Sequence, residues 1–217
     1  DKNIKETAII GTRNIINSVT DSCKIIFPST HVVYEGFEET KLDIDESEQT
    51  CPTLSYANSK VQSEIDLKQS NKNYVILRFA SVYGYSSDTM RTNIMPNLFS
   101  KIASQNGTIK LFSGGVQLKS LVPLLDVVRC LKFIEERTDI NKDLFHLSKE
   151  SMTVKEVAEI CKNINPKLKI IETDDKIPNR GYTISNKKLL STGFKFRYSI
   201  KECIEEMIHN WSERKIN

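Results

Sequence analysis

Short apolar runs alternate with amphipathic stretches in the first half of the chain, and this alternation restricts the fold more than any other feature. Residues 3–19 carry apolar side chains near helical spacing, and residues 24–27 form a short apolar run. The same order then repeats, with a helical pattern over residues 56–69 and an apolar run without alternation over residues 74–79. Strands joined by helices form parallel sheets through right-handed crossovers. We therefore expect an α/β fold built on a parallel sheet.

The pattern changes after Gly84, where we expect a smaller mixed lobe. A loop is expected over residues 85–92. Further helices are expected over residues 94–104, 126–137, 154–163 and 199–214, and further strands over residues 108–112, 144–147 and 168–172. Thr153 and Glu156 have the spacing of a capping box, which predicts that a helix starts there. We divide the chain into residues 1–84, joined by the returning residues 126–147, and residues 85–217.

Composition excludes several classes of protein. The 217 residues are 39% hydrophobic and 27% charged, as in folded globular proteins. Lys and Arg number 31 against 28 Asp and Glu, and they are scattered, so we expect no nucleic-acid partner. No run is apolar enough for a membrane span and the start lacks a signal peptide, so we expect no membrane contact and a cytoplasmic protein. The five cysteines are never spaced Cys-x-x-Cys, so neither a disulfide framework nor a metal site is expected.

Tyr56 and Lys60 lie one helical turn apart, in the segment Tyr-Ala-Asn-Ser-Lys. On a helix, both side chains project from the same face. An ammonium beside a phenol favours the phenolate and lowers the phenol pKa from its usual value of about 10. The pair can therefore act as an acid and base near neutral pH. The alternative is a surface helix that carries a tyrosine and a lysine at this spacing by chance.

Thr30 follows the expected strand at its carboxyl end, which is where parallel α/β sheets bind ligands. Its hydroxyl can hydrogen-bond a reacting oxygen and help to pass a proton to Tyr56. The alternative is a hydroxyl that only caps a turn.

These segments, taken in order, resemble a known family. A strand ending in Ser-Thr-x-x-x-Tyr is followed by Tyr-x-x-x-Lys and then by a strand running into Arg-Phe-Ala-Ser-Val-Tyr-Gly at residues 78–84. This order resembles the extended short-chain dehydrogenase/reductase family of nucleotide-sugar epimerases and dehydratases. Residues 10–14, 93–96 and 115–127 also resemble family segments, so the resemblance covers nearly the whole chain.

The resemblance implies a Rossmann-like domain in residues 1–84 that holds NAD, with NADP as an open alternative, and a substrate-binding lobe in residues 85–217. It implies that Tyr56 is the general acid and base, and that Lys60 also binds the nicotinamide ribose. It further implies that Tyr56, Ser29 and Phe79 contact the cofactor. The substrate contacts that it implies are Thr30, Ser81, Asn93 and Lys119. For Lys119, a solvated surface lysine is the alternative.

The chain also departs from the family pattern. The Gly-rich turn that meets the cofactor pyrophosphate has no counterpart in these residues. We therefore expect a partial sheet that lacks the first βαβ units, so that activity belongs to a longer parent protein. Ala8, Ser81, Lys119 and Pro123 replace residues that are usual in the family, which leaves the sugar undetermined.

His31 and Val32 follow Thr30, where family dehydratases place Asp-Glu, and this argues against a 4,6-dehydratase. The leading hypothesis is NAD-dependent epimerisation of a nucleotide-activated sugar. The alternatives are a reductase, decarboxylase or dehydratase of the same family, and a non-catalytic protein that binds a nucleotide or a partner. By analogy with the family, the helix over residues 56–69 is expected to take part in a homodimer.

Overall fold

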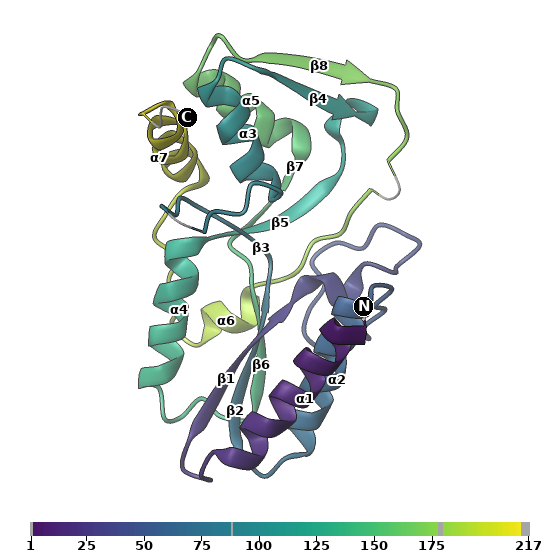
Figure 1. Ribbon diagram of the computed structural model, residues 1–217, viewed down its shortest axis with the longest axis vertical. Helices are drawn as coiled ribbons and strands as arrows, with labels where there is room; N and C mark the ends of the chain where they lie inside the picture. Colours follow the sequence, from purple (N-terminus) through teal and green to yellow (C-terminus); the bar gives the residue numbers. More distant parts are fainter. Residues whose placement is uncertain (1, 88, 178–179, 214–217) are drawn as a thin grey trace. The chain divides into compact units, whose positions relative to one another are not determined.

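The structure is a computed structural model that describes residues 2–87, 89–177 and 180–213 (Figure 1). The chain forms two compact units. The first unit comprises Asp1–Ala80, Arg129–Ser148 and Ile184–Lys195, and the second comprises Ser81–Val128, Lys149–Thr183 and Phe196–Asn217. Each unit is therefore assembled from separate stretches of sequence.

The first unit contains a parallel sheet of three described strands in the order β1-β2-β6. Its strands are β1 (Lys24–Thr30), β2 (Asn73–Phe79) and β6 (Asp143–Leu147). Thr30 pairs with Phe79, and Phe79 pairs with Leu147, so the three strands end together at one edge of the sheet. This arrangement confirms the expected parallel α/β sheet.

Two helices, α1 (Lys2–Ser18) and α2 (Ser55–Gln69), pack side by side against this sheet (Figure 1). Ile16 from α1 and Leu67 from α2 meet Phe27 and Ile76 from the strands in one buried cluster. Removing these side chains from water stabilises the layered packing. Arg13 adds a bidentate contact to Asp66 between the two helices.

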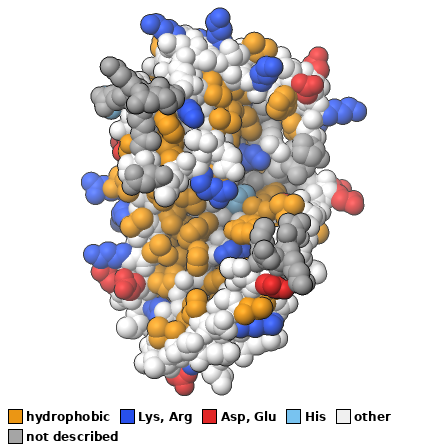
Figure 2. Space-filling model, in the orientation of Figure 1, with side chains coloured by type: hydrophobic (Ala, Val, Ile, Leu, Met, Phe, Trp, Pro, Cys, Tyr) orange, Lys and Arg blue, Asp and Glu red, His pale blue; other side chains and the backbone are white. Residues whose placement is uncertain are grey.

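The residues after β1 form a 3-10 turn, η1 (His31–Tyr34), and then a long loop. A single parallel bridge joins Ile44 in this loop to Ile184, and the short helix α6 (Lys187–Ser191) follows that bridge. Apolar side chains reach the surface over the part of the first unit where β1 lies (Figure 2). Ile25 and Ile26 of β1 are only half-buried, and Pro28 is exposed.

The second unit holds two small sheets. One has the order β3-β5-β7, with β3 parallel and β7 antiparallel to β5, and the other is the parallel pair β4 and β8. The strands are β3 (Ser81–Tyr83), β4 (Thr108–Phe112), β5 (Leu118–Pro123), β7 (Glu150–Thr153) and β8 (Lys169–Thr173). A turn, η2 (Ser113–Gly115), follows β4.

Three helices cover these sheets: α3 (Met95–Ser104), α5 (Val154–Ile164) and α7 (Ile200–Glu213). Their shared core includes Phe99, Leu111, Val157 and Ile204, each buried. The helix α4 (Leu124–Glu136) begins directly after β5. The predicted capping box is confirmed, because the Thr153 side chain accepts from the Glu156 backbone and the Glu156 side chain accepts from the Thr153 backbone.

Several described elements were not predicted, namely η1, β3, β5, β7 and α6. The strand β7 contains one large apolar residue, Met152, and Lys119 and Ser120 interrupt the apolar residues of β5. The pairing of β5 with β7 creates the buried environment of Ser120. A sequence pattern carries no sign of such pairing, because it depends on a partner about thirty residues away. The predicted end of the last helix at Arg214 lies outside the described residues.

Candidate active site

Thr30 lies at the carboxyl-terminal edge of the first sheet, as the last residue of β1. Its side chain is buried, and its Oγ1 accepts a hydrogen bond from the Val32 backbone N at 3.2 Å. This contact begins η1 and does not use the hydroxyl hydrogen, which can still be donated to a ligand. Thr30 is therefore both a turn cap and a potential donor. Its strand partner Phe79 is half-buried at the same edge.

The helix α2 carries Tyr56 and Lys60 toward this edge. Tyr56 is 44% exposed, in the first turn of the helix. Lys60 Nζ lies 5.9 Å from the centre of the Tyr56 ring and 4.7 Å from that of Phe27, and it donates to the Pro28 carbonyl oxygen at 2.6 Å. The fold thus brings Lys60 to both the tyrosine and the last residues of β1.

The charge on Lys60 is held in a partly desolvated place. Burial lowers the pKa of Lys60, and the negative charge of Glu64 acts in the opposite direction. Since Glu64 follows Lys60 by one helical turn, the two charges stabilise each other along the same face of α2. An ammonium in this position stabilises negative charge that develops on a neighbouring group.

Behind this edge lies a buried charged network. Arg78 on β2 donates from Nε to Glu64 Oε1 at 3.0 Å and from Nη2 to Oε2 at 2.6 Å. Ser29 Oγ also donates to Glu64 Oε1, at 2.5 Å. The hydroxyl of Ser29, a predicted cofactor contact, is therefore bonded to Glu64. All three side chains are buried, so the network joins α2, β1 and β2 directly beside Thr30.

The network continues to β6 through Tyr34. The Tyr34 hydroxyl contacts Arg78 Nη1 and lies 3.0 Å from His146 Nε2. Burial raises the pKa of Tyr34 to about 12, and burial together with the charge of Arg78 lowers the pKa of His146 to about 3. Both side chains are therefore neutral at pH 7. His146 belongs to the packing of the first unit.

The network was missed at the sequence level, although two signals were available. Glu64 continues the spacing of Tyr56 and Lys60 by one more helical turn. Arg78 is the one charged residue inside an otherwise apolar strand. A buried charge is costly unless it is paired, so such a residue predicts a buried partner.

The remaining predicted residues belong to the second unit. Ser81 starts β3, Asn93 is exposed just before α3, and Lys119 is half-buried on β5. Burial lowers the pKa of Lys119 and is the only cause resolved for that shift. A second amide was missed: Asn97 accepts from Gly84 N at 3.1 Å and donates to Arg91 O at 3.0 Å, which holds the loop beside Asn93.

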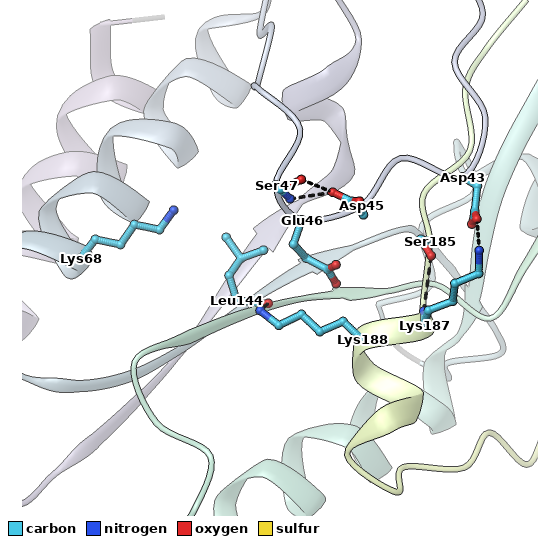
Figure 3. Close-up of a pocket in the computed structure, with 9 residues that line it drawn as sticks. All are labelled: Asp43, Asp45, Glu46, Ser47, Lys68, Leu144, Ser185, Lys187 and Lys188. Carbon is cyan, nitrogen blue, oxygen red and sulfur yellow. Dashed lines mark hydrogen bonds and ion pairs between the residues drawn. The ribbon is translucent and has the colours of Figure 1, made fainter.

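A separate cavity of about 550 Å³ lies within the first unit (Figure 3). Its lining residues are Asp43, Asp45, Glu46, Ser47, Lys68, Leu144, Ser185, Lys187 and Lys188. Lys187 pairs with Asp43, and Lys188 Nζ donates to the Leu144 carbonyl oxygen at 2.9 Å. Glu46 Oε1 accepts from the His146 backbone N at 2.7 Å. Most of these charges already have partners in the chain, so the cavity is part of the packing that holds β6.

The part of the chain that the structure describes lacks two features. Within the ranges that the structure describes, no group of three or more His, Cys, Asp or Glu side chains is arranged to hold a metal ion. None of the described helices combines the length and the apolar character needed to cross a membrane.

Comparison with known proteins connects this arrangement to a family. The model of the NAD dependent epimerase/dehydratase family matches residues 2–145, which is well over half of the chain. These residues include Thr30, Tyr56 and Lys60.

Solved structures share the fold at low sequence identity. UDP-glucose 4-epimerase from Thermotoga maritima, solved with UDP-glucose, is 21% identical with a TM-score of 0.81, over 94% of this chain and 69% of that chain. RMD from Pseudomonas aeruginosa, complexed with NADPH, is 16% identical with a TM-score of 0.83, over 96% and 74%. A dTDP-glucose 4,6-dehydratase from Bacillus anthracis in complex with NAD is 16% identical with a TM-score of 0.78, over 97% and 69%. This chain therefore has the fold of these proteins.

Proposed function

The chain belongs to the NAD-dependent epimerase/dehydratase family, and from this premise we propose that its parent protein epimerises a nucleotide-activated sugar by transient oxidation of one sugar carbon. The observation that carries the proposal is the placement of Lys60 between the Tyr56 ring and the end of β1. The Lys60 ammonium, the Tyr56 phenol and the Thr30 hydroxyl can then act on a ligand at the same edge of the sheet.

The residues at this edge fit the nicotinamide end of NAD. An ammonium has three hydrogens to donate, and the bond from Lys60 to the Pro28 carbonyl oxygen uses one of them. The other two can be donated to ribose hydroxyl oxygens, and the lysine stays protonated when it makes these bonds. Phe79 supplies an apolar contact, and Ser29 shapes the edge while its hydroxyl binds Glu64. Bound NAD would supply the hydride transfer from and back to the sugar carbon.

Tyr56 moves the proton in this scheme. Its phenolate takes the proton of the sugar hydroxyl as the carbon–hydrogen bond breaks, which leaves a ketone. Lys60 provides a positive charge beside Tyr56, and Thr30 donates a hydrogen bond to the reacting oxygen. After the ketone has turned over in the site, Tyr56 returns the proton as hydride reaches the opposite face. The substrate and product are isomers, so the reaction consumes no cofactor.

Lys119, Asn93 and Ser81 are proposed to bind the nucleotide diphosphate. Lys119 supports this assignment most directly, because burial alone lowers its pKa and a phosphate would restore a favourable environment for its charge. Asn93 and Ser81 add an amide and a hydroxyl that suit phosphate oxygens.

Epimerisation is preferred to dehydration because of the residues after Thr30. Removal of water from a sugar needs an acid and a base beside the reacting carbon, and His31 and Val32 stand where family dehydratases carry carboxylates. The comparisons include both epimerases and a dehydratase, so this preference depends on these two positions.

The test is to incubate the full-length parent protein with NAD, or NADP, and a panel of nucleotide sugars, and to separate the products by chromatography. An epimer formed without net NADH, and lost in Tyr56→Phe, supports the proposal. Loss of water from the sugar identifies a dehydratase, and net change in NADH or release of carbon dioxide identifies a reductase or decarboxylase. Sugar binding without turnover identifies a non-catalytic binding protein.

A further inference from the structure

The helix that carries Tyr56 begins without a cap of its own. The N-cap residue of α2 is Leu54, whose side chain cannot accept a hydrogen bond, and the first turn contains no acidic residue. Helix starts are normally satisfied by Ser, Thr, Asp or Asn at the N-cap, or by a carboxylate in the first turn. The start of α2 therefore depends on another part of the chain.

Glu35 supplies the missing acceptor. Its Oε1 accepts from the Leu54 backbone N at 2.9 Å and from Thr53 Oγ1 at 2.8 Å. Glu35 is distant in sequence from both residues, so these bonds join two separate segments. A carboxylate also suits this position because the amino-terminal end of a helix carries a partial positive charge.

The segment that contains Glu35 starts at Thr30. Thr30 caps η1, and Glu35 is the residue that directly follows this turn. Two backbone bonds hold the same segments together: Cys51 N donates to Val33 O at 2.8 Å, and Gly36 N donates to Cys51 O at 2.9 Å. Hydrogen bonds therefore connect the short segment that begins at Thr30 to the start of α2.

The approach of these segments is close. A Cβ atom added to Gly36 would lie 2.3 Å from Cys51 O and 2.8 Å from its Sγ. Only glycine permits this approach, because a Cβ atom cannot lie so close to atoms to which it is not bonded. We call Glu35, Gly36, Cys51, Thr53 and Leu54 the Glu35 clamp.

We propose that Glu35 is a positioning residue that fixes Tyr56 relative to Thr30, an inference that rests on the proposed function. Thr30 and Tyr56 belong to different elements, and both must reach the same sugar oxygen. A misplacement of about 1 Å can lower a rate by about a hundredfold. The Glu35 clamp acts at the first turn of α2, where Tyr56 lies, whereas the Glu64 network acts two turns further along the helix.

Glu35 can be tested without disrupting the core, because it is only partly buried and its bonds lie at the surface. The test variants are Glu35→Ala, which removes the acceptor, and Glu35→Gln, whose amide oxygen can accept both bonds. The matched control is Glu202→Ala in the second unit. Glu202 Oε2 accepts from Ser199 N at 2.9 Å and from Ser199 Oγ at 2.7 Å at the start of α7, so it makes the same two kinds of bond.

In the full-length protein, Glu35→Ala should lower kcat by roughly tenfold to a hundredfold while KM changes by less than about twofold. Glu35→Gln should keep most of the wild-type kcat, and Glu202→Ala should match the wild type. An equal loss in Glu35→Ala and Glu202→Ala would mean that any lost cap lowers activity, and this would overturn the inference. Unchanged kcat in Glu35→Ala would also overturn it.

Amide hydrogen exchange provides a second readout that does not depend on turnover. Glu35→Ala should increase exchange at residues 54–58 by about tenfold, and Glu202→Ala should leave these amides unchanged. If the wild type converts no nucleotide sugar, the proposed function fails, and exchange alone decides whether Glu35 holds α2. No change in exchange at these amides in Glu35→Ala would overturn the clamp, whatever the activity.

Discussion

Arg78 and Glu64 form a bidentate ion pair inside the first unit, with Nη2 2.6 Å from Oε2 and Nε 3.0 Å from Oε1. Their side chains are 4% and 2% exposed, so water stabilises neither charge. The pair ties the helix that carries Tyr56 and Lys60 to the central strand of the first sheet. Ser29 joins the same carboxylate, which places the pair directly behind Thr30.

We expect Arg78→Met to lower the free energy of unfolding by about 3–5 kcal/mol, because it leaves the Glu64 carboxylate buried without its partner. Urea unfolding followed by circular dichroism measures the effect. The control is Arg137→Met, which removes the partly exposed pair with Asp139 and one bond to the Thr192 carbonyl oxygen, and it should lower stability much less than Arg78→Met. The double variant Glu64→Leu/Arg78→Met should recover much of the loss, and a double variant as unstable as Arg78→Met would contradict this account.

His146 should make the protein less stable in mild acid. Its pKa is about 3 in the folded protein, against about 6.5 in the unfolded chain, so the unfolded chain binds an extra proton between these values. The stability that depends on neutral His146 is complete above about pH 6.5 and is lost as pH falls toward 3, at up to about 1.4 kcal/mol per pH unit.

The measurement is the free energy of unfolding from pH 7 to pH 4, for the wild type and for His146→Gln. The difference between the two should shrink as pH falls, because glutamine does not titrate. Glu46, whose pKa burial raises, is present in both proteins, so its contribution cancels. If the free energy of unfolding fell equally with pH in the wild type and in His146→Gln, then His146 would not be the source of the acid sensitivity.

Lys60→Met should lower kcat strongly. The Lys60 ammonium lies 5.9 Å from the centre of the Tyr56 ring, so without it the negative charge on Tyr56 during proton transfer loses a stabilising neighbour. We expect kcat at pH 7 to fall by about 10²–10⁴. Lys60→Arg keeps a cation and should retain more of the activity. A kcat in Lys60→Met equal to that of the wild type would separate Lys60 from proton transfer by Tyr56.

Lys119→Met should weaken substrate binding without weakening the fold. We expect KM for the nucleotide sugar to rise by about tenfold to a hundredfold, because one charged hydrogen bond to phosphate is lost. We expect kcat to change little. Since burial disfavours the charge of Lys119 in the free protein, thermal stability without ligand should stay equal or increase. The control is the exposed Lys110 on β4, where Lys110→Met should leave KM unchanged. An unchanged or lower KM in Lys119→Met, or an unstable Lys119→Met protein, would contradict the assignment.

Local patterns in the sequence were sufficient to predict the main elements and part of the site. The apolar runs of β1 and β2 and the helical spacing of α1 and α2 indicated a parallel sheet, because a buried strand and an amphipathic helix each have their own periodicity. Tyr56 and Lys60 could be placed on one face for the same reason. The capping box at Thr153 was equally local, since its two partners are three residues apart.

Contacts between distant segments could be decided only by the tertiary structure. The partnership of Glu64 with Arg78, the pairing of β5 with β7 and the cap that Glu35 provides for α2 all join residues that no repeating pattern connects. A strand such as β7, or a glutamate such as Glu35, has several possible partners in the unfolded chain. Which partner it meets depends on how the hydrophobic faces pack, and only the folded chain brings those particular atoms within bonding distance.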